Sequence, residues 1–379
     1  MVIVGVPKET ADLEKRVALI PETVAKLVEK GLDVQVEKDA GLASNYLDES
    51  YREAGATIVD NRSELFSSAD ILIAIQTPDR EDLDKLKEGS VLVCFLWALQ
   101  NESTVAFLKE KNITALGMDA VPRISRAQNM DALSSMSSIA GYKATLIGAN
   151  ELDRYLPMMM TAAGTVAPAK VLVLGAGVAG LQAIATAKRL GAVVEAFDIR
   201  PAVKEQVESL GAKFVEVPDL DEDTETKGGY AKELSEDKQE RQRQVIHEHA
   251  KKSDIIITTA LIPGKPAPKL VTKQMVHDMH PGSVVVDLAA EQGGNCELTE
   301  AGETIEVNEV KIAGPLNIAS SLAYHASQLY SKNMMALLDH LLEEGKPLFD
   351  FEDEITLNTT ITHRGEIISP MLKENSKSE

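Results

Sequence analysis

Short apolar stretches alternate with helical periodicities along most of the chain. In the first 120 residues, runs rich in valine, isoleucine and leucine predict strands, and the segments between them, such as 21–31 and 102–112, repeat apolar residues at helical spacing. Strands that are almost continuously apolar and separated by helices are typical of a parallel sheet with helices on both faces. The predicted strands cover residues 2–6, 33–38, 56–60, 70–76, 90–97 and 113–121.

The same alternation starts again after residue 168. A second set of predicted strands covers residues 169–175, 192–198, 212–217, 254–260, 283–289 and 310–314. Long helical stretches, at about 131–155 and 317–345, bracket this set. We therefore expect an α/β protein with two doubly wound, Rossmann-like parallel-sheet domains, joined by long helices with a cleft between them. The expected domains are 1–135 plus 326–379, and 136–325.

Composition and charge restrict the class of protein. The 379 residues are 44% apolar and 26% charged, with a net charge of −20, which argues against binding to nucleic acid or to anionic lipid. No apolar run is long enough to span a membrane, and the first residues do not resemble a signal peptide. The cysteines, Cys94 and Cys296, have no metal-ligand spacing and predict free thiols in the cytoplasm. His277 and His280 lack a third ligand nearby, so we expect no metal site.

The strongest local motif is the glycine-rich turn of residues 175–180, with the sequence GAGVAG. It follows a predicted strand, opens a predicted helix, and precedes a second strand that ends in Asp198. In such a turn the first glycine permits the sharp bend, the second lets pyrophosphate approach the backbone, and the third lets the helix pack closely. Asp198 predicts a preference for NAD over NADP, although Arg200 could favour NADP. The predicted contacts here are Gly175, Gly177, Val178, Ala179, Gly180, Asp198, Ile199 and Arg200.

Two further segments lie at predicted strand ends. Thr259, Ala260 and Leu261 end a strand and begin the proline-rich segment 261–270, where doubly wound sheets bind ligands. Lys265 belongs to the same segment and is either a ligand contact or a surface charge. The acidic segment 219–244 is a long insertion, which indicates either a lid over a ligand or a solvated charged stretch.

The polar segment 121–142, VPRISRAQNMDALSSMSSIAGY, contains no evident nucleophile, metal ligand or paired acid and base. Asp131 directly precedes a helical periodicity, so one interpretation of the segment is a capped helix start. The other interpretation is a loop that positions a ligand.

Taken together, residues 121–142, 174–201, 228–234, 258–271 and 284–297 resemble the NAD(H)-binding component of the proton-translocating, Re/Si-specific NAD(P) transhydrogenases. That family is similar in turn to alanine dehydrogenase. The resemblance covers nearly the whole chain. It implies hydride transfer from NADH to NADP⁺ held on an NADP(H)-binding partner component, with a membrane-spanning component coupling the transfer to proton movement. It further implies a homodimer, peripheral on the inner face of the cytoplasmic membrane through its partner subunits.

The resemblance also assigns roles to residues of the polar segment. Arg123, Gln128, Asp131 and Ser134 would form a loop at the nicotinamide, in which Gln128 reaches toward the ribose of the incoming NADP. Arg123 and Asp131 would brace each other, and Ser134 would bind the nicotinamide amide. The remaining cofactor contacts that it implies are Gly229 and Tyr230 of a mobile loop, with Thr259, Ala260, Leu261, Lys265 and Glu291.

Alanine dehydrogenases need a lysine and a histidine in the first domain, and this chain has Gln76 and Trp97 at those positions. Glutamine cannot shuttle a proton, and indole is a donor without a basic site. Arg16 resembles the substrate-binding arginine of the dehydrogenases, but a salt bridge at the domain cleft is an equal alternative. Two other functions stay open: an amino-acid dehydrogenase, and a non-catalytic protein that binds NAD(H) as a regulator.

Overall fold

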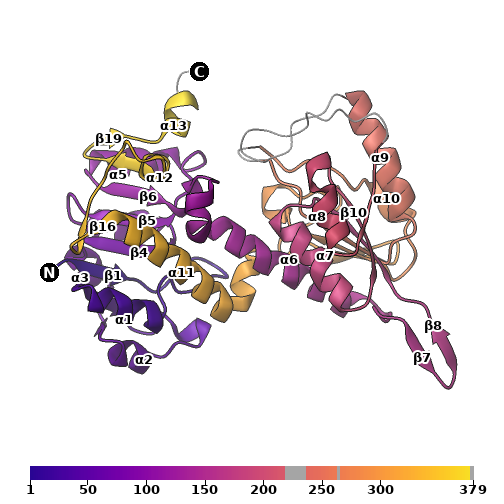
Figure 1. The fold of residues 1–379 in the computed structure, drawn as a ribbon, viewed down its shortest axis with the longest axis horizontal. Helices are drawn as coiled ribbons and strands as arrows, with labels where there is room; N and C mark the ends of the chain where they lie inside the picture. Colours follow the sequence, from indigo (N-terminus) through magenta and orange to yellow (C-terminus); the bar gives the residue numbers. More distant parts are fainter. Residues whose placement is uncertain (218–235, 263–264, 376–379) are drawn as a thin grey trace. The chain divides into compact units, whose positions relative to one another are not determined.

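The computed structural model describes residues 1–217, 236–262 and 265–375. The chain divides into two compact units, Met1–Met136 with Ser320–Glu379, and Ser137–Ala319. In Figure 1 the first unit combines the indigo and purple elements with the yellow C-terminal ones, and the second unit runs from magenta to orange. The C-terminal segment thus belongs to the same unit as the first residues.

The first unit is built on an eight-stranded sheet with the order β19-β18-β6-β5-β4-β1-β2-β3. Neighbouring strands from β3 to β6 are parallel, and β18 and β19 extend the β6 edge as antiparallel strands. The strands are β1 (Ile3–Val6), β2 (Asp33–Glu37), β3 (Thr57–Val59), β4 (Ile71–Gln76), β5 (Val91–Phe95), β6 (Thr114–Gly117), β18 (Thr360–His363) and β19 (Glu366–Ile367).

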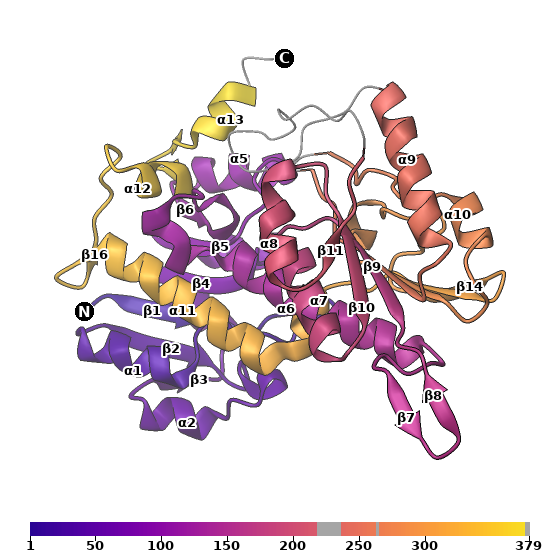
Figure 2. The same ribbon diagram turned by 45° about the vertical axis from the view of Figure 1, so that its right-hand side comes forward.

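Helices connect the parallel strands of the sheet, and helix α11 crosses the unit beside the N-terminal elements (Figures 1 and 2). A small hairpin of β16 (Leu342–Glu343) and β17 (Lys346–Pro347) follows α11. The α-helices of the unit are α1 (Pro21–Glu29), α2 (Asp48–Glu53), α3 (Arg62–Ser68), α4 (Arg80–Lys85), α5 (Glu102–Glu110), α11 (Ala323–Leu341), α12 (Glu354–Thr359) and α13 (Pro370–Asn375). The short 3₁₀ segments are η1 (Leu42–Ser44), η2 (Met118–Ala120), η3 (Ser125–Met130) and η6 (Ile318–Leu322).

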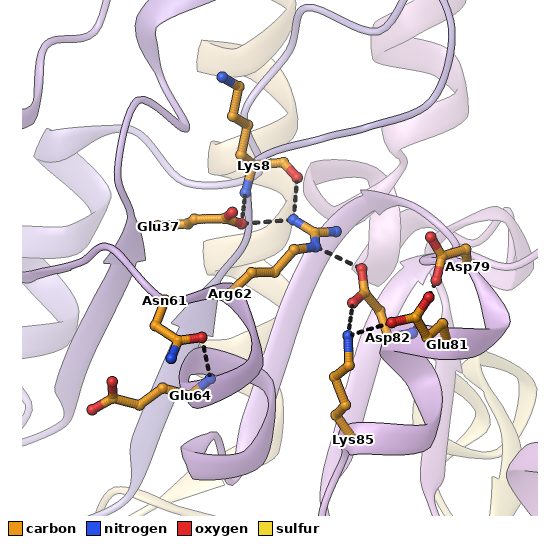
Figure 3. A network of polar contacts seen from close by, with 9 residues as sticks. All are labelled: Lys8, Glu37, Asn61, Arg62, Glu64, Asp79, Glu81, Asp82 and Lys85. Atoms are coloured by element: carbon orange, nitrogen blue, oxygen red, sulfur yellow. Dashed lines mark hydrogen bonds and ion pairs between the residues drawn. The ribbon is translucent and has the colours of Figure 1, made fainter.

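Arg62, the first residue of α3, joins several of the loops that follow the strands (Figure 3). Its Nε donates to Asp82 at 2.6 Å, and its Nη1 donates to Glu37 at 2.6 Å and to the carbonyl of Lys8 at 2.8 Å. Helix α4 starts beside this network because the carboxylate of Asp79 accepts the backbone N–H of Asp82. The arginine therefore ties together the end of β2, the segment that follows β1 and helix α4, which follows β4.

The second unit is built on a seven-stranded sheet with the order β11-β10-β9-β12-β13-β15-β14. All its neighbours are parallel except β14, which pairs with β15 in the antiparallel direction. The strands are β9 (Lys170–Leu174), β10 (Val193–Phe197), β11 (Lys213–Phe214), β12 (Ile255–Thr258), β13 (Val284–Asp287), β14 (Thr304–Val307) and β15 (Val310–Ala313). Helix α6 (Ala132–Glu151) begins in the first unit and continues into the second. The other helices of the second unit are α7 (Val178–Arg189), α8 (Lys204–Ser209), α9 (Glu236–Ala250) and α10 (Lys273–His277), with η4 (Pro201–Val203) and η5 (Ala290–Gln292).

Both faces of the second sheet are buried under apolar residues. Along β9, Val171 and Val173 belong to one hydrophobic cluster, and Leu172 and Leu174 belong to another. Because successive strand residues point to opposite faces, both clusters require a cover of helices. The expected α/β fold with two parallel-sheet domains is confirmed.

Several elements differ from the prediction. The antiparallel edge strands β14, β18 and β19 were not predicted, and neither was the hairpin of β7 (Met159–Thr161) and β8 (Gly164–Val166), which projects from the second unit in Figure 2. The long helices are shorter than predicted, because α6 ends at Glu151 and η6 precedes α11. Within the acidic segment 219–244, residues from Glu236 onward are already part of α9.

Both cysteines are free and buried. Cys94 lies in β5 and Cys296 follows β13, and burial raises the pKa of each thiol. Among the described helices, none is both long and apolar enough to cross a membrane.

Candidate functional site

The second sheet changes winding direction between its neighbouring strands β9 and β12. The strand order on one side of this point is β9, β10, β11, and on the other side it is β12, β13, β15. Doubly wound sheets bind ligands at such a point, in the crevice beyond the carboxyl ends of the strands. Gly175 follows β9 and Thr259 follows β12, so the glycine-rich turn and the 259–261 segment meet there. Thr259 Oγ1 donates to the carbonyl of Gly175 at 3.1 Å.

The three glycines of the turn face different surroundings. Gly175 has a φ of +99°, which favours glycine, and a Cβ at this position would lie 2.6 Å from Thr259 Oγ1. A Cβ at Gly180 would lie 1.8 Å from the Gly175 carbonyl oxygen, so the helix start packs directly on the turn. A Cβ at Gly177 would have no heavy atom within 4 Å. Open space above bare backbone at Gly177 is what a bound phosphate requires.

Helix α7 begins immediately after this open space. It has twelve residues with Gly177 as its N-cap, and the backbone N–H groups of its first turn have no partner within the helix. The macrodipole adds positive potential at the same end, which suits an anion. Val178 and Leu261 are apolar but 41% and 39% exposed at this crevice, so a bound ligand would cover them.

Asp198 follows β10 and is 8% exposed. Its Oδ2 accepts the backbone N–H of Ala176 at 2.7 Å, which ties the acid to the glycine-rich turn. Arg200 donates to the same carboxylate from its backbone N–H and from its guanidinium, at 2.8–2.9 Å. Asp198 thus lies at the turn as predicted, and Arg200 is paired with it.

Asn295, which the sequence reasoning missed, holds the segment after β12 in place. Its side chain is completely buried, accepts the N–H of Ala260 at 3.0 Å and donates to the carbonyl of Ala260 at 2.8 Å. It also donates to the carbonyl of Pro268. Lys269 is no free surface charge, since it donates to the carbonyls of Gly293 and Cys296.

Other predicted cofactor contacts have different environments. The Glu291 carboxylate accepts the backbone N–H of Asn317 at 2.6 Å, so it fixes the chain ahead of η6. Lys265 is exposed in the segment after β12. Gly229 and Tyr230 lie outside the described residues.

The predicted nicotinamide loop belongs to the first unit. Gln128 lies on η3 with an exposed side chain, and no described residue forms a hydrogen bond with its amide. Asp131 caps helix α6: its carboxylate accepts the Ser134 backbone N–H at 2.8 Å and the Ser134 hydroxyl at 2.5 Å. The capping interpretation of Asp131 is therefore correct for this structure. Arg123 is exposed on the segment that leads into η3.

A buried polar network surrounds the position where the dehydrogenases have lysine. Gln76 donates to Glu14 at 3.0 Å, and Arg16 forms a two-pronged pair with the same carboxylate at 2.5 and 2.7 Å. Arg16 is 4% exposed, so its guanidinium is engaged inside the first unit. Burial opposes ionisation of Glu14, but the hydrogen bond and charge of Arg16 outweigh it and lower its pKa to about 2. Burial raises the pKa of Glu9, which accepts the N–H groups of Ile75 and Gln76, to about 7.

Trp97, at the position of the dehydrogenase histidine, is 40% exposed. Its ring stacks on Phe95 with centroids 5.8 Å apart, and its backbone N–H donates to Asp119.

The first unit also has a cavity of about 250 Å³ beyond β1 and β4, lined by Lys8, Arg62 and Asp79 among others. This cavity lacks a glycine-rich turn. Among the described residues, no three acidic, histidine or cysteine side chains are grouped as a metal site requires.

Comparisons with known proteins show the family of the chain. The family models "Alanine dehydrogenase/PNT, N-terminal domain" and "C-terminal domain" match residues 5–140 and 144–370. The chain is 50% identical to an NAD(P) transhydrogenase subunit alpha chain of Rhodospirillum rubrum, over 97% of this chain and 98% of that one. A solved transhydrogenase structure from Sinorhizobium meliloti matches with a TM-score of 0.88 and 46% identity, over 97% of this chain and all of that one.

Alanine dehydrogenases are more distant. The enzyme from Staphylococcus saprophyticus is 31% identical, over 96% of this chain and 95% of that one. The resemblance of the sequence to transhydrogenases is therefore confirmed. The chain belongs to the alanine dehydrogenase/PNT family, and within that family it is more similar to the subunit alpha of NAD(P) transhydrogenases than to alanine dehydrogenase.

Proposed function

We propose that this chain is the NAD(H)-binding component of a proton-translocating, Re/Si-specific NAD(P) transhydrogenase. It transfers a hydride between NADH and NADP⁺ bound on a partner component, and a membrane-spanning partner couples the transfer to proton movement. The observation that carries the proposal is the glycine-rich turn at the centre of the second sheet, in a chain that is 50% identical to a transhydrogenase subunit.

The residues around the turn suit a dinucleotide. The N–H groups at the start of α7 bind the pyrophosphate above Gly177, and Gly175 and Gly180 keep the turn tight enough for this approach. Asp198 binds the hydroxyls of the adenosine ribose and repels a 2′-phosphate, which favours NAD(H) over NADP(H). The segment 259–261, with Lys265, Glu291, Gly229 and Tyr230, completes the proposed contacts.

The chemistry of hydride transfer is consistent with the side chains at positions 76 and 97. NADH, when bound, supplies the hydride, and no proton is exchanged with the protein in that step. The chain therefore needs no general acid or base, which agrees with Gln76 and Trp97 at the positions of the dehydrogenase lysine and histidine. What the protein supplies is position, because holding two reacting groups in the right geometry lowers the barrier by several kcal/mol.

Gln128 is the residue that we assign to the partner's nucleotide. Its amide is exposed and has no hydrogen-bond partner among the described residues, so it is available to a ribose hydroxyl of NADP(H). Arg123, Asp131 and Ser134 of the same loop bind the nicotinamide end of NADH. In this proposal Ser134 exchanges its hydrogen bond with Asp131 for one with the carboxamide.

The proposed assembly follows from the same assignment. A subunit alpha acts with NADP(H)-binding and membrane-spanning components, and we propose that this chain is a homodimer held at the inner face of the cytoplasmic membrane by those partners. An amino-acid dehydrogenase is the alternative function. Gln76 and Trp97, which stand at the positions of the dehydrogenase lysine and histidine and cannot act as a general acid or base, argue against it.

The experiment combines the purified chain, loaded with NADH, with the NADP(H)-binding partner component and NADP⁺. Single-turnover absorbance or fluorescence should show hydride transfer that requires both proteins. In the same buffer, alanine or glutamate with NAD⁺ should give no reduction. Turnover on an amino acid, together with no transfer to NADP⁺, would replace the transhydrogenase assignment with the dehydrogenase one.

A further inference from the structure

The carboxylate of Asp198 is already saturated with hydrogen bonds. Within the described part of the chain, Oδ1 accepts the backbone N–H and the Nε of Arg200, both at 2.9 Å. Oδ2 accepts the N–H of Ala176 at 2.7 Å and the Nη2 of Arg200 at 2.8 Å. A carboxylate offers about four acceptor sites, and these donors use all of them.

The four donors are not equally easy to displace. Those of Ala176 and the Arg200 backbone belong to the glycine-rich turn and to the chain after β10, so removing them would require movement of the main chain. The other two come from one side chain, and they take one site on each carboxylate oxygen. A pair of adjacent ribose hydroxyls also presents two donors side by side. The guanidinium of Arg200 thus occupies the sites that a ribose diol needs.

We infer that Arg200 is a built-in competitor of the adenosine ribose, and that NAD(H) binds by displacing its guanidinium from Asp198. This inference rests on the proposed function, because it concerns how the same site takes its dinucleotide. The displaced contacts are strong ones: the side chains of Arg200 and Asp198 are 14% and 6% exposed, and hydrogen bonds between charged groups are about twice as strong as neutral ones. Exchanging them for neutral hydroxyls lowers the affinity for NAD(H) and speeds its release.

The consequence suits a subunit that must exchange its nucleotide in every cycle. A carboxylate that is paired with Arg200 before the nucleotide binds avoids the cost of a buried, unpartnered charge. The free energy gained when the ribose binds is then only the difference between its hydrogen bonds with Asp198 and those of the Arg200 guanidinium. Arg200 therefore sets how long the nucleotide stays, while the turn and Asp198 set which nucleotide binds.

The test measures NADH affinity and dissociation rate in the full chain for Arg200→Met and Arg200→Lys. Methionine keeps an unbranched stem but cannot donate, so NADH should bind roughly tenfold more tightly and dissociate more slowly. Lysine keeps the charge without the two-pronged geometry, so its gain should be smaller, about threefold. Reduced nicotinamide mononucleotide, which lacks the adenosine ribose, should bind equally to all three proteins.

A double-mutant cycle separates competition from a structural role. In an Asp198→Asn background, Arg200→Met should no longer increase NADH affinity, because the guanidinium then has no carboxylate to occupy. Weaker or unchanged NADH binding by folded Arg200→Met and Arg200→Lys proteins would overturn the inference and leave the NAD(H) site in place. A failure of the unaltered chain to bind NADH would overturn the proposed function and the inference together.

Discussion

The side-chain amide of Asn333 donates a hydrogen bond of 2.8 Å to the backbone carbonyl of Asn129, the residue that follows Gln128. Asn333 lies on α11 and is 6% exposed, so helix α11 holds η3 through a partly buried contact. On the exposed side of the same segment, Arg126 pairs with Asp353 at 2.9 Å. These contacts fix the backbone from which the Gln128 amide extends.

Asn333→Ala should therefore slow hydride transfer without weakening NADH binding. Removing the amide breaks this partly buried hydrogen bond, which costs about 0.5–1.5 kcal/mol of stability and loosens η3. We expect a rate at least about fivefold lower in single-turnover transfer with the partner component. NADH affinity should stay within about twofold, measured by calorimetry.

Ser331→Ala is the matched control, on the same helix. The Ser331 hydroxyl accepts the Ile20 N–H and donates to Thr23, so its loss also breaks buried hydrogen bonds but leaves η3 untouched. It should lower the melting temperature and keep the transfer rate. Equal transfer rates for the Asn333 and Ser331 variants would show that α11 does not position Gln128.

Two glycine substitutions should separate folding from binding. Gly180→Ala places a methyl group where a Cβ would lie 1.8 Å from the Gly175 carbonyl oxygen, so it should cost about 2 kcal/mol or more of stability and abolish NADH binding.

Gly177→Ala should leave the melting temperature almost unchanged, because the added methyl group meets no neighbour and the φ of Gly177 is −76°. Its methyl group projects into the open space that we assign to the phosphates, so NADH affinity should fall at least about tenfold. Normal NADH binding by Gly177→Ala would argue against pyrophosphate at this position.

Gln128→Asn should separate binding from transfer. Asparagine keeps the amide and shortens the side chain by one methylene, so the partner's nucleotide loses its positioning contact. We expect single-turnover transfer to slow by at least about tenfold, which corresponds to ~1.4 kcal/mol of barrier. The NADH dissociation constant should change by less than about threefold. Tenfold weaker NADH binding with normal transfer at saturation would make Gln128 a ligand of NADH instead.

Glu9 should make the folded chain less stable as the pH rises from about 4.5 to about 7. Its pKa is about 7 in the folded chain because of burial, and 4.5 ordinarily, so in this range the folded state holds a proton that the unfolded state has released. Folding stability then decreases with pH, and Glu9 contributes no slope outside the range. Glu14 has the opposite effect: because its pKa is lowered from 4.5 to about 2, its contribution to folding stability increases as the pH rises through that lower range.

The measurement compares melting temperatures of the unaltered chain and Glu9→Gln at pH 5, 6, 7 and 8. The neutral amide does not titrate, so the difference in melting temperature, variant minus unaltered, should increase from pH 5 to pH 7 and then level off. A difference that stays constant over this range would exclude titration of Glu9 between these pH values.

The parallel sheets could be predicted because their strands are buried on both faces, which leaves continuous apolar runs such as 70–76 and 283–289 in the sequence. The edge strands could not be predicted from the sequence. β18 and β19 have the sequence TITHRGEI, in which polar residues interrupt the apolar ones, and their position depends on pairing with β6, more than 200 residues away in the chain.

The candidate site likewise has parts that could be predicted from the sequence and parts that could not. The turn at 175–180 carries a local motif between a predicted strand and a predicted helix, so its form could be predicted from nearby sequence. Asn295 and Asn333 carry no such signal, because each binds a backbone group 35 or 204 residues away. The sequence indicates that Arg200 could favour NADP, but it does not show that the side chain folds back onto Asp198.

The burial of both cysteines makes the chain well suited to site-specific chemical labelling. Thiol reagents react with the thiolate, and at neutral pH the two native thiols are inaccessible and protonated, because burial raises the pKa of both. A single cysteine introduced at exposed Asn129 would therefore be the one reactive thiol of the described chain. An environment-sensitive dye attached there, next to Gln128, would report by its emission when a partner's nucleotide arrives, and on what timescale.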